Sequence, residues 1–281
     1  MKMKEYLKKP FSLVMMLLII LSAILTVVSM AFIVGYILIK GVPSINLQLF
    51  AWEYNSENVS MLPAVINTLY ITFLTLSIAV PAGVFAAVYL VEYAKRGSRL
   101  VKLIRLTTET LSGIPSIVYG LFGFLAFVIA LGWHYSVLSG ALTLAIMVLP
   151  TIIRTTEEAL MAVPDSYREG SFGLGAGKLR TVFKIIIPSA MSGIISGIIL
   201  ATGRITGETA ALIFTAGTVA EIPRSLMSSA RTLAVHMYCL LSEGLYTNQA
   251  YATAVVLMVT VIAINALSDF AAKRISQNGG A

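Results

Sequence analysis

Two ionisable side chains, Arg204 and Glu208, lie four positions apart in a stretch of sequence that is otherwise apolar. On a continuous helix this spacing puts both on one face, where they can pair. In a membrane-spanning helix such residues are energetically costly and face a water-filled path or a partner. A guanidinium group suits tetrahedral oxyanions, and Thr206 and Thr209 add hydroxyl groups nearby. This pattern predicts an anion path, although a clamp between packed helices would use the same pair.

A second segment with chemical character runs from Arg168 to Pro188 and is short, basic and rich in glycine. Before it, Pro164 favours the end of a helix, and a short new helix is expected over residues 167–172. Three glycines then allow a sharp change of direction, at positions 173, 175 and 177. Apolar residues return at helical spacing up to Pro188. We interpret this segment as a docking element for a separate protein.

The run Gly175-Ala176-Gly177-Lys178 in this segment partly matches the phosphate-binding loop of nucleotide-binding proteins. That loop requires a glycine five residues before the Gly-Lys pair and a Ser or Thr after it. Phe172 and Leu179 occupy those positions. We therefore expect no ATP site of this kind here, so that any ATP-driven step would depend on another chain.

The composition indicates a membrane protein. Hydrophobic residues make up 58% of the chain and charged residues only 12%, and five long runs contain no charge at all. Each run can supply the roughly 20 apolar residues of a spanning helix. The longest run can form two helices, because turn and interfacial residues interrupt it at 132–136. The six expected spans are residues 12–39, 64–91, 110–131, 137–153, 186–215 and 250–268.

Lys and Arg residues concentrate on one side of these spans. Sixteen fall in the two tails and in the second and fourth connections, whereas three fall on the other side, namely Lys40, Arg224 and Arg231. Because cytoplasmic segments carry the excess of positive charge, both termini are predicted to be cytoplasmic. The first span is too long for the ~7–15 apolar residues of a signal peptide, so we expect it to remain uncleaved. We divide the chain into a cytoplasmic tail, residues 1–10, and one transmembrane domain, residues 11–281, whose coupling loop is residues 154–184.

This topology accounts for the net charge of +7, so nucleic-acid binding is not needed to explain it. The single cysteine, Cys239, cannot form an internal disulfide, and the two histidines, His134 and His236, are far apart and expected at interfaces or in loops. The sequence contains no recognisable set of nucleophile, base and orienting group. We expect a chain that is not an enzyme and holds no metal or cofactor of its own.

The docking segment resembles the cytoplasmic signature of ABC importer permeases. That signature reads Glu-Ala-Ala, three residues, Gly, nine residues and then Ile-x-Leu-Pro. Here Glu169-Gly170-Ser171, Gly175 and Ile185-Ile186-Ile187-Pro188 keep every spacing. The replacements are small or conservative, although Gly170 could weaken the helix by ~1 kcal/mol. In the family this segment is the coupling helix, which sits in a cleft of the ATP-hydrolysing subunit.

Further motifs are similar to the permeases of phosphate-specific ABC importers. The string that starts at Arg204, Arg-Ile-Thr-Gly-Glu-Thr-Ala, resembles their fifth span, whereas sulfate and molybdate relatives usually continue with Phe-Gly. Residues 112–120 resemble a segment of their third span, and residues 154–159 resemble the exit of their fourth. The run at 243–254 is closer to the A-type, PstA-like subunits than to the C-type subunits.

The resemblance implies an all-α, six-span permease of the type I ABC importer fold, forming half of a phosphate path in a bacterial or archaeal cytoplasmic membrane, with lipid around its spans. The candidate path residues are Arg154, Arg204, Thr206, Glu208 and Thr209. The candidate coupling residues are Glu169, Gly170, Ser171, Gly175 and Pro188. The implied partners are a C-type permease, a dimer of ATP-binding subunits that holds ATP and Mg, and an extracytoplasmic phosphate-binding protein.

Several alternatives remain open at this point. A sulfate or molybdate importer would use the same arginine chemistry, since spacing alone permits other tetrahedral oxyanions. An ion-coupled secondary transporter would use Glu208 to carry protons, and a receptor or scaffold would dock a partner without any flux. Arg154 could be an ordinary positive anchor near the cytoplasmic face. The outer loop 216–248 could be an interfacial helix under a binding protein or a structural cap.

Overall fold

The chain folds as a bundle of long helices in a computed structural model, which describes residues 10–95 and 97–278, with side chains as far as residue 270. Residues 1–9 of the expected tail, with their four lysines, and Arg96 lie outside the described residues, as do the side chains of Lys273 and Arg274. The described residues contain no β-strand, so the predicted all-α class is confirmed. Within a membrane, helices satisfy their backbone polar groups internally, which explains this outcome.

The described residues form α-helices joined by short 3-10 and π-helical segments. The α-helices are α1 Pro10–Gly41, α2 Leu62–Val88, α3 Arg99–Ser112, α4 Ser116–Gly123, α5 Val137–Met161, α6 Asp165–Gly173, α7 Lys178–Thr181, α8 Ile187–Thr206, α9 Ala210–Thr215, α10 Leu233–Glu243 and α11 Thr247–Asn278. The 3-10 segments are η2 Val42–Ser44 and η3 Leu47–Phe50. The π-helical segments are η4 Tyr89–Tyr93, η5 Phe124–Ala130 and η6 Val182–Ile186.

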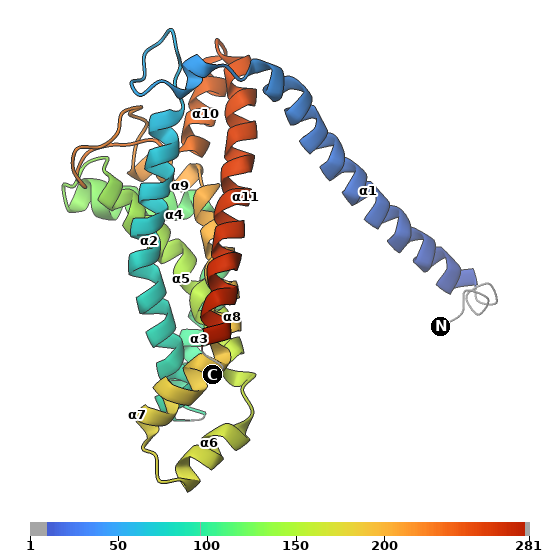
Figure 1. Ribbon diagram of the computed structural model, residues 1–281, viewed down its shortest axis with the longest axis vertical. Helices are drawn as coiled ribbons and strands as arrows, with labels where there is room; N and C mark the ends of the chain where they lie inside the picture. Colours follow the sequence, from blue (N-terminus) through green and yellow to red (C-terminus); the bar gives the residue numbers. More distant parts are fainter. Residues whose placement is uncertain (1–9, 96, 279–281) are drawn as a thin grey trace.

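Five stretches of the described chain are long and apolar enough to cross a membrane, and one bent pair of helices supplies a sixth span. The five are Phe11–Ser44, Leu62–Tyr93, Val137–Met161, Lys178–Thr206 and Thr247–Phe270. The prediction of six spans is therefore confirmed. In Figure 1 the start of α1 and the end of α11 both point toward the half of the molecule that carries α6, as an even number of spans requires.

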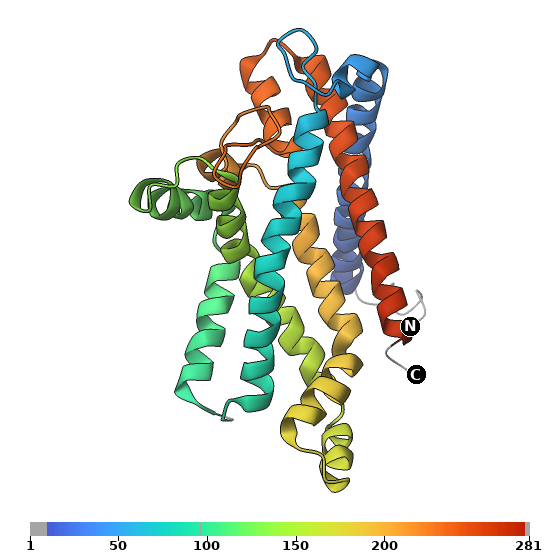
Figure 2. The same ribbon diagram turned by 60° about the vertical axis from the view of Figure 1, so that its left-hand side comes forward.

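The third span is not the straight helix that was predicted over residues 110–131. α3 and the following helix over Ser116–Ala130 meet at an angle of 105°. Pro115 lacks a backbone N–H and restricts the residue before it, so the helix breaks between Ser112 and Ser116. The hydroxyl of Tyr119 donates to the carbonyl of Leu111 at 2.8 Å and braces the bend. As a result η5 runs sideways out of the bundle (Figure 2).

The fifth span is also interrupted, whereas one helix was predicted over residues 186–215. α8 ends at Thr206, and α9 begins only at Ala210. Gly207, a weak helix former, stands directly after α8. This break places Arg204 in the last turn of one helix and Glu208 before the first turn of another.

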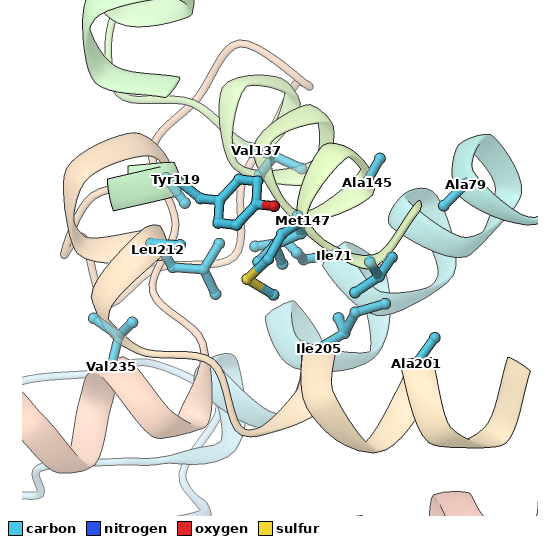
Figure 3. Close-up of a cluster of buried hydrophobic side chains, with 14 of the residues drawn as sticks. Ile71, Ala79, Tyr119, Val137, Ala145, Met147, Ala201, Ile205, Leu212 and Val235 are labelled. Carbon is cyan, nitrogen blue, oxygen red and sulfur yellow. The ribbon is translucent and has the colours of Figure 1, made fainter. Parts of the chain in front are cut away.

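The centre of the bundle is formed by α2, α5 and α8, in which α5 packs extensively against both α2 and α8 and the other two contact each other less. Their buried side chains meet those of α4, α9 and α10 in one hydrophobic cluster (Figure 3). Small residues allow close approach between membrane helices. Gly83 of α2 lies against Ile152, and Gly197 of α8 lies against Thr155. The α5 helix, which contacts both, is therefore the axis around which the spans are arranged.

The first helix stands apart from this bundle. α1 contacts α11 near its carboxyl end, where Gly41 lies against Tyr251 and the rings of Tyr36 and Tyr251 are 5.8 Å apart. From there it runs obliquely away from the other helices (Figure 1). None of its most apolar 18-residue window is buried. A long apolar helix that is exposed in this way is open to lipid or to another membrane chain.

The outer end of the bundle is closed by the segment between α9 and α11. The side-chain amide of Asn67 in α2 donates to the carbonyls of Glu221 at 3.0 Å and Arg231 at 3.2 Å. The N–H of Leu233 donates to the hydroxyl of Thr68 at 2.8 Å. α10 then packs against α11 and α2 with half of its residues in the core. Two interpretations were left open for residues 216–248. For α10, which lies in this segment, the structure agrees with a packed structural cap.

The close contact between α5 and α8 gives a direct test of this packing. A methyl group added by Gly197→Ala would come within 2.7 Å of the Cβ of Thr155. Overpacking of this kind costs about 1–3 kcal/mol, so the midpoint of thermal unfolding in detergent should fall. Gly203→Ala on the same helix is the matched control, because the nearest new neighbours lie 3.8 Å away on Asn265. Equal midpoints for the two variants would contradict the described packing.

Candidate functional site

Arg204 lies where α8 ends inside the bundle. Its side chain is half-buried and makes no hydrogen bond or ion pair within the described part of the chain. The phenol of Tyr119 in α4 lies close enough to experience its charge. The carboxyl end of a helix stabilises a cation, so the guanidinium is held without using its own N–H groups. These donors are the ones that a tetrahedral anion would bind.

Glu208 does not pair with Arg204 as the sequence spacing predicted. α8 ends between the two residues, so they do not share a helical face. The buried carboxylate of Glu208 instead accepts a hydrogen bond from the N–H of Ala211 at 3.1 Å. An acidic group is stabilised at the amino end of a helix. Glu208 therefore fixes the turn between α8 and α9 and leaves the charge of Arg204 unneutralised by it.

The two candidate threonines lie on either side of this turn. The hydroxyl of Thr206 is buried and donates to the backbone carbonyl of Thr202 in the same helix at 3.0 Å. Thr209 is the residue before α9, half-buried, and its side chain makes no capping hydrogen bond. Of the two threonines, Thr209 is the one whose hydroxyl remains able to donate a hydrogen bond to an anion.

Sequence reasoning missed a polar neighbour of this region, Asn265 of α11. A Cβ on Gly203, next to Arg204, would lie 3.8 Å from both polar atoms of the Asn265 amide. The Oδ1 atom of Asn265 is buried and has no hydrogen-bond partner among the described residues. Polar groups inside a membrane span are costly and often functional. The amide in an otherwise apolar span was the signal that could have identified it.

Arg154 lies in different surroundings, near the cytoplasmic end of α5. Its Nε donates to Glu158 at 3.0 Å, and both side chains are exposed. Next to this pair, the Nε of Arg105 in α3 donates to Glu157 at 3.2 Å. The residues around a pocket of about 230 Å³ are Arg105, Thr108, Glu109, Arg154, Glu157, Glu158 and Met161. An anion in this pocket would compete with carboxylates for the arginines.

Arg154 and Arg204 mark two levels of the bundle and do not form one site. α5 and α8 run in opposite directions, and Thr155 lies against Gly197. Arg204 is seven residues beyond Gly197 on α8, which is about 10 Å of helix rise toward the outer end. The two guanidinium groups are therefore arranged along the long axis of the molecule.

The predicted coupling residues lie on a helical hairpin that projects beyond the other helices (Figure 1). Glu169, Gly170 and Ser171 are in α6, which confirms the short helix predicted over residues 167–172. Gly175 follows with a φ of +81°, a conformation that favours glycine. Pro188 is in the first turn of α8. The hairpin is closed by a hydrogen bond of 2.8 Å between the hydroxyls of Ser171 and Thr181.

Arg168 joins this hairpin to the spans. Its Nη2 donates to the carboxylate of Glu92 at 2.7 Å, and the two side chains are only 16% and 8% exposed. The same guanidinium donates to the carbonyls of Leu160 at 3.0 Å and Val163 at 2.9 Å. Glu92 is in η4 at the end of the second span, and the two carbonyls are at the end of the fourth. The sequence placed Arg168 only among the cytoplasmic charges, because its partner is 76 residues away.

The hairpin exposes several apolar side chains among its charged ones. Leu174 is 91% exposed, and Leu179 is also largely exposed. Tyr167 and Phe172 of α6 expose about half of their side chains. Apolar side chains gathered at an exposed tip are typical of a surface that another protein covers. The hairpin therefore has the composition of a docking surface.

A buried polar cluster at the outer end was not predicted. The guanidinium of Arg231 lies 4.6 Å from the centre of the Tyr54 ring, and the ring of His236 meets the same ring edge-on at 6.1 Å. His236 is fully buried in α10 and not in an interfacial or loop position. Burial, together with the charge of Arg231, lowers the pKa of His236 to about 3, so the ring is neutral at physiological pH. The presence of Arg231 in a largely apolar outer loop was the available signal.

Comparison with known proteins relates these features to a family. The profile of the binding-protein-dependent transport system inner membrane component matches residues 79–278. The probable ABC transporter permease protein YqgI of Bacillus subtilis is 36% identical over 249 residues, covering 82% of this chain and 84% of that protein. The phosphate transport system permease protein PstA of Haemophilus influenzae is 31% identical over 267 residues, covering 94% of each.

Solved structures show the same fold. A chain of a bacterial alginate ABC transporter, in complex with a periplasmic protein bound to alginate pentasaccharide, superposes with a TM-score of 0.71 and 14% identity. The match covers 96% of this chain and 98% of that one, so the predicted ABC permease fold is confirmed. The matched profile spans the interrupted fifth span and the cytoplasmic hairpin as well as the packed core. The chain is a multi-pass membrane protein that belongs to the family of binding-protein-dependent transport system inner membrane components.

Proposed function

We propose that this chain is one permease subunit of an ATP-driven phosphate importer in a bacterial or archaeal cytoplasmic membrane. It would form half of the phosphate path and perform no chemistry itself. A dimer of ATP-binding subunits would hold ATP and Mg and dock on α6. The observation that carries the proposal is the projecting hairpin, which is apolar at its tip and joined by Arg168 to two spans.

Phosphate as the substrate is supported by two independent arguments. PstA of Haemophilus influenzae, a phosphate transport system permease protein, matches this chain over nearly its whole length. The half-buried guanidinium of Arg204, which lacks a partner within the described chain, supplies the charge-assisted donors that a tetrahedral oxyanion requires. Sulfate or molybdate would satisfy the same donors, so the second argument supports an oxyanion and the first supports phosphate.

A second permease subunit would complete the path. The exposed length of α1 offers an apolar helix with no partner in the described chain, and the sequence contains no internal repeat that would supply a second half. We assign this surface to a C-type permease. An extracytoplasmic phosphate-binding protein would deliver the anion at the opposite end from α6.

The ion-coupled alternative would need Glu208 to bind and release a proton during transport. Its carboxylate is buried and already accepts the N–H that begins α9. Protonation would weaken this interaction at the helix terminus, which makes Glu208 better suited to a structural role. The arrangement therefore favours an ATP-driven cycle over a proton-driven one.

Reconstitution separates these functions directly. The chain, a C-type permease, the ATP-binding subunits and a phosphate-binding protein would be placed in liposomes, and uptake of labelled phosphate measured. We expect uptake that requires ATP and persists when an ionophore removes the proton gradient. Uptake of sulfate in place of phosphate would identify the related oxyanion importer. Uptake that needs only the gradient, or docking without any uptake, would contradict the proposal.

The role of Arg204 can be separated from a packing role. Arg204→Gln removes the charge and should lower phosphate uptake by about one to two orders of magnitude, because hydrogen bonds to charged groups contribute roughly 1.5–3 kcal/mol each. The yield of assembled complex, measured by size-exclusion chromatography, should change little. Arg99→Gln, at the exposed start of α3, is the control and should preserve both. If Arg204→Gln reduced assembly as much as uptake, the residue would be a clamp between helices.

A further inference from the structure

Arg231 is a charged residue that is almost fully enclosed by the chain. It is 5% exposed, and its Nε and Nη2 atoms have no hydrogen-bond partner among the described residues. Its guanidinium lies over the ring of Tyr54, a cation–π contact that provides no counter-charge. A buried charge without a counter-charge costs several kcal/mol. The arrangement therefore calls for an anion that is not part of this chain.

The two unpaired atoms define the shape of that anion. Nε and Nη2 form one edge of the guanidinium, and Arg168 uses the same two atoms to hold Glu92. This edge offers two parallel N–H donors, which match two oxygens of a carboxylate or a phosphate. Arg231 also lies just before α10, whose amino end adds a partial positive charge.

Further buried polar atoms without a hydrogen-bond partner belong to the same region, including both ring nitrogens of His236. The amide of Asn67 has a fixed orientation, because its nitrogen donates to the carbonyls of Glu221 and Arg231. Its Oδ1 therefore points elsewhere, is buried, and has no partner among the described residues. The hydroxyl of Thr232 is buried and unpaired in the same sense. The region thus contains a fixed acceptor as well as the donors of Arg231.

Tyr54 contacts the guanidinium of Arg231 and also lines an open pocket. The pocket has a volume of about 400 Å³ and lies at the outer end. Its lining residues are Trp52, Glu53, Tyr54, Pro63, Glu221, Ile222 and Arg224. A rotation of the half-buried Tyr54 side chain would connect the pocket to the guanidinium. The carboxylates of Glu53 and Glu221 repel a fully ionised anion but can accept a hydrogen bond from an anion that carries an O–H group.

We propose that Arg231, Asn67 and Thr232 form an outer anion site that takes hydrogen phosphate in preference to sulfate. The identification of phosphate as the ligand rests on the proposed function. A protonated phosphate oxygen can donate to the Oδ1 of Asn67 while two other oxygens accept from Arg231. Sulfate has no proton at neutral pH and would leave this acceptor unpaired, which costs affinity.

Residues next to the site and next to Arg204 pack into the same hydrophobic core. Val235, next to His236 on α10, belongs to the same hydrophobic cluster as Ile205, the neighbour of Arg204 (Figure 3). The outer site would hold phosphate before it reaches Arg204. Specificity would then be set at the entrance, where rejecting sulfate prevents its entry into the path.

Trp52 provides a reporter for this site, because it lines the outer pocket. The chain contains two tryptophans, so Trp133→Phe leaves Trp52 as the only one. The full chain in lipid nanodiscs would be titrated with inorganic phosphate and, separately, with sulfate. We expect a saturable change in fluorescence with phosphate and none with sulfate at equal concentration. Arg231→Met should weaken the phosphate response on the order of tenfold to a hundredfold, whereas Arg99→Met, at the exposed start of α3 and away from this pocket, is the control and should leave it almost unchanged.

The temperature of thermal unfolding distinguishes a loss of phosphate binding from a loss of folding in this variant. In phosphate-free buffer Arg231→Met should unfold at the same temperature as the parent or higher, because the variant no longer buries an unpaired charge. A clearly lower temperature would show a structural partner for Arg231 and overturn the proposal. Equal phosphate titrations of parent and Arg231→Met, or equal responses to sulfate and phosphate, would also overturn it. If the reconstituted importer still transports phosphate in that case, the proposed function stands and only this site fails.

Discussion

One guanidinium connects the cytoplasmic hairpin with the membrane spans. Arg168 binds Glu92 at the end of the second span and two carbonyls at the end of the fourth, so a displacement of α6 must move or break these contacts. Both partners are largely buried, and a charge left behind by a broken pair would be poorly solvated. Two π-helical segments, η4 and η6, lie at this junction, and such segments often occur at functional sites. The hairpin can therefore act as a lever on the bundle.

Farther from the hairpin, the fifth span is interrupted next to two charged residues. The break between α8 and α9 places Arg204 at a helix end, and Glu208 stabilises the next helix. Irregular backbone at membrane depth is tolerated where protein covers it or where it lines a cavity, and broken helices of this kind form substrate sites in other transporters. The three arginines have different surroundings. Arg154 is in an exposed ion pair, Arg204 is at a half-buried helix end, and Arg231 is in an enclosed cluster. These differences suit successive steps of one path better than a single binding site.

Local patterns in the sequence predicted much of this fold. The count of spans followed from apolar length. The hairpin followed from Pro164 and the glycines at 173, 175 and 177, because helix ends and turns are set by neighbouring residues. The breaks in the third and fifth spans were missed, since a run of apolar residues reports hydrophobicity and not helical continuity. The pairing of Arg204 with Glu208 was wrong for the same reason. The contacts of Arg168 and Arg231 depend on residues from distant helices, and no spacing along the chain could reveal them.

We infer that the ion pair of Arg168 and Glu92 transmits the movement of α6 to the spans. It is tested most directly by the amount of phosphate taken up per ATP hydrolysed in the reconstituted complex, for Arg168→Gln, Glu92→Gln and the double variant. Residues that act as a unit show non-additive losses. We predict that each single variant lowers this ratio while ATP hydrolysis continues, and that the double variant is no worse than the more severe single one. An unchanged ratio in both single variants, or losses that add in the double variant, would contradict this account.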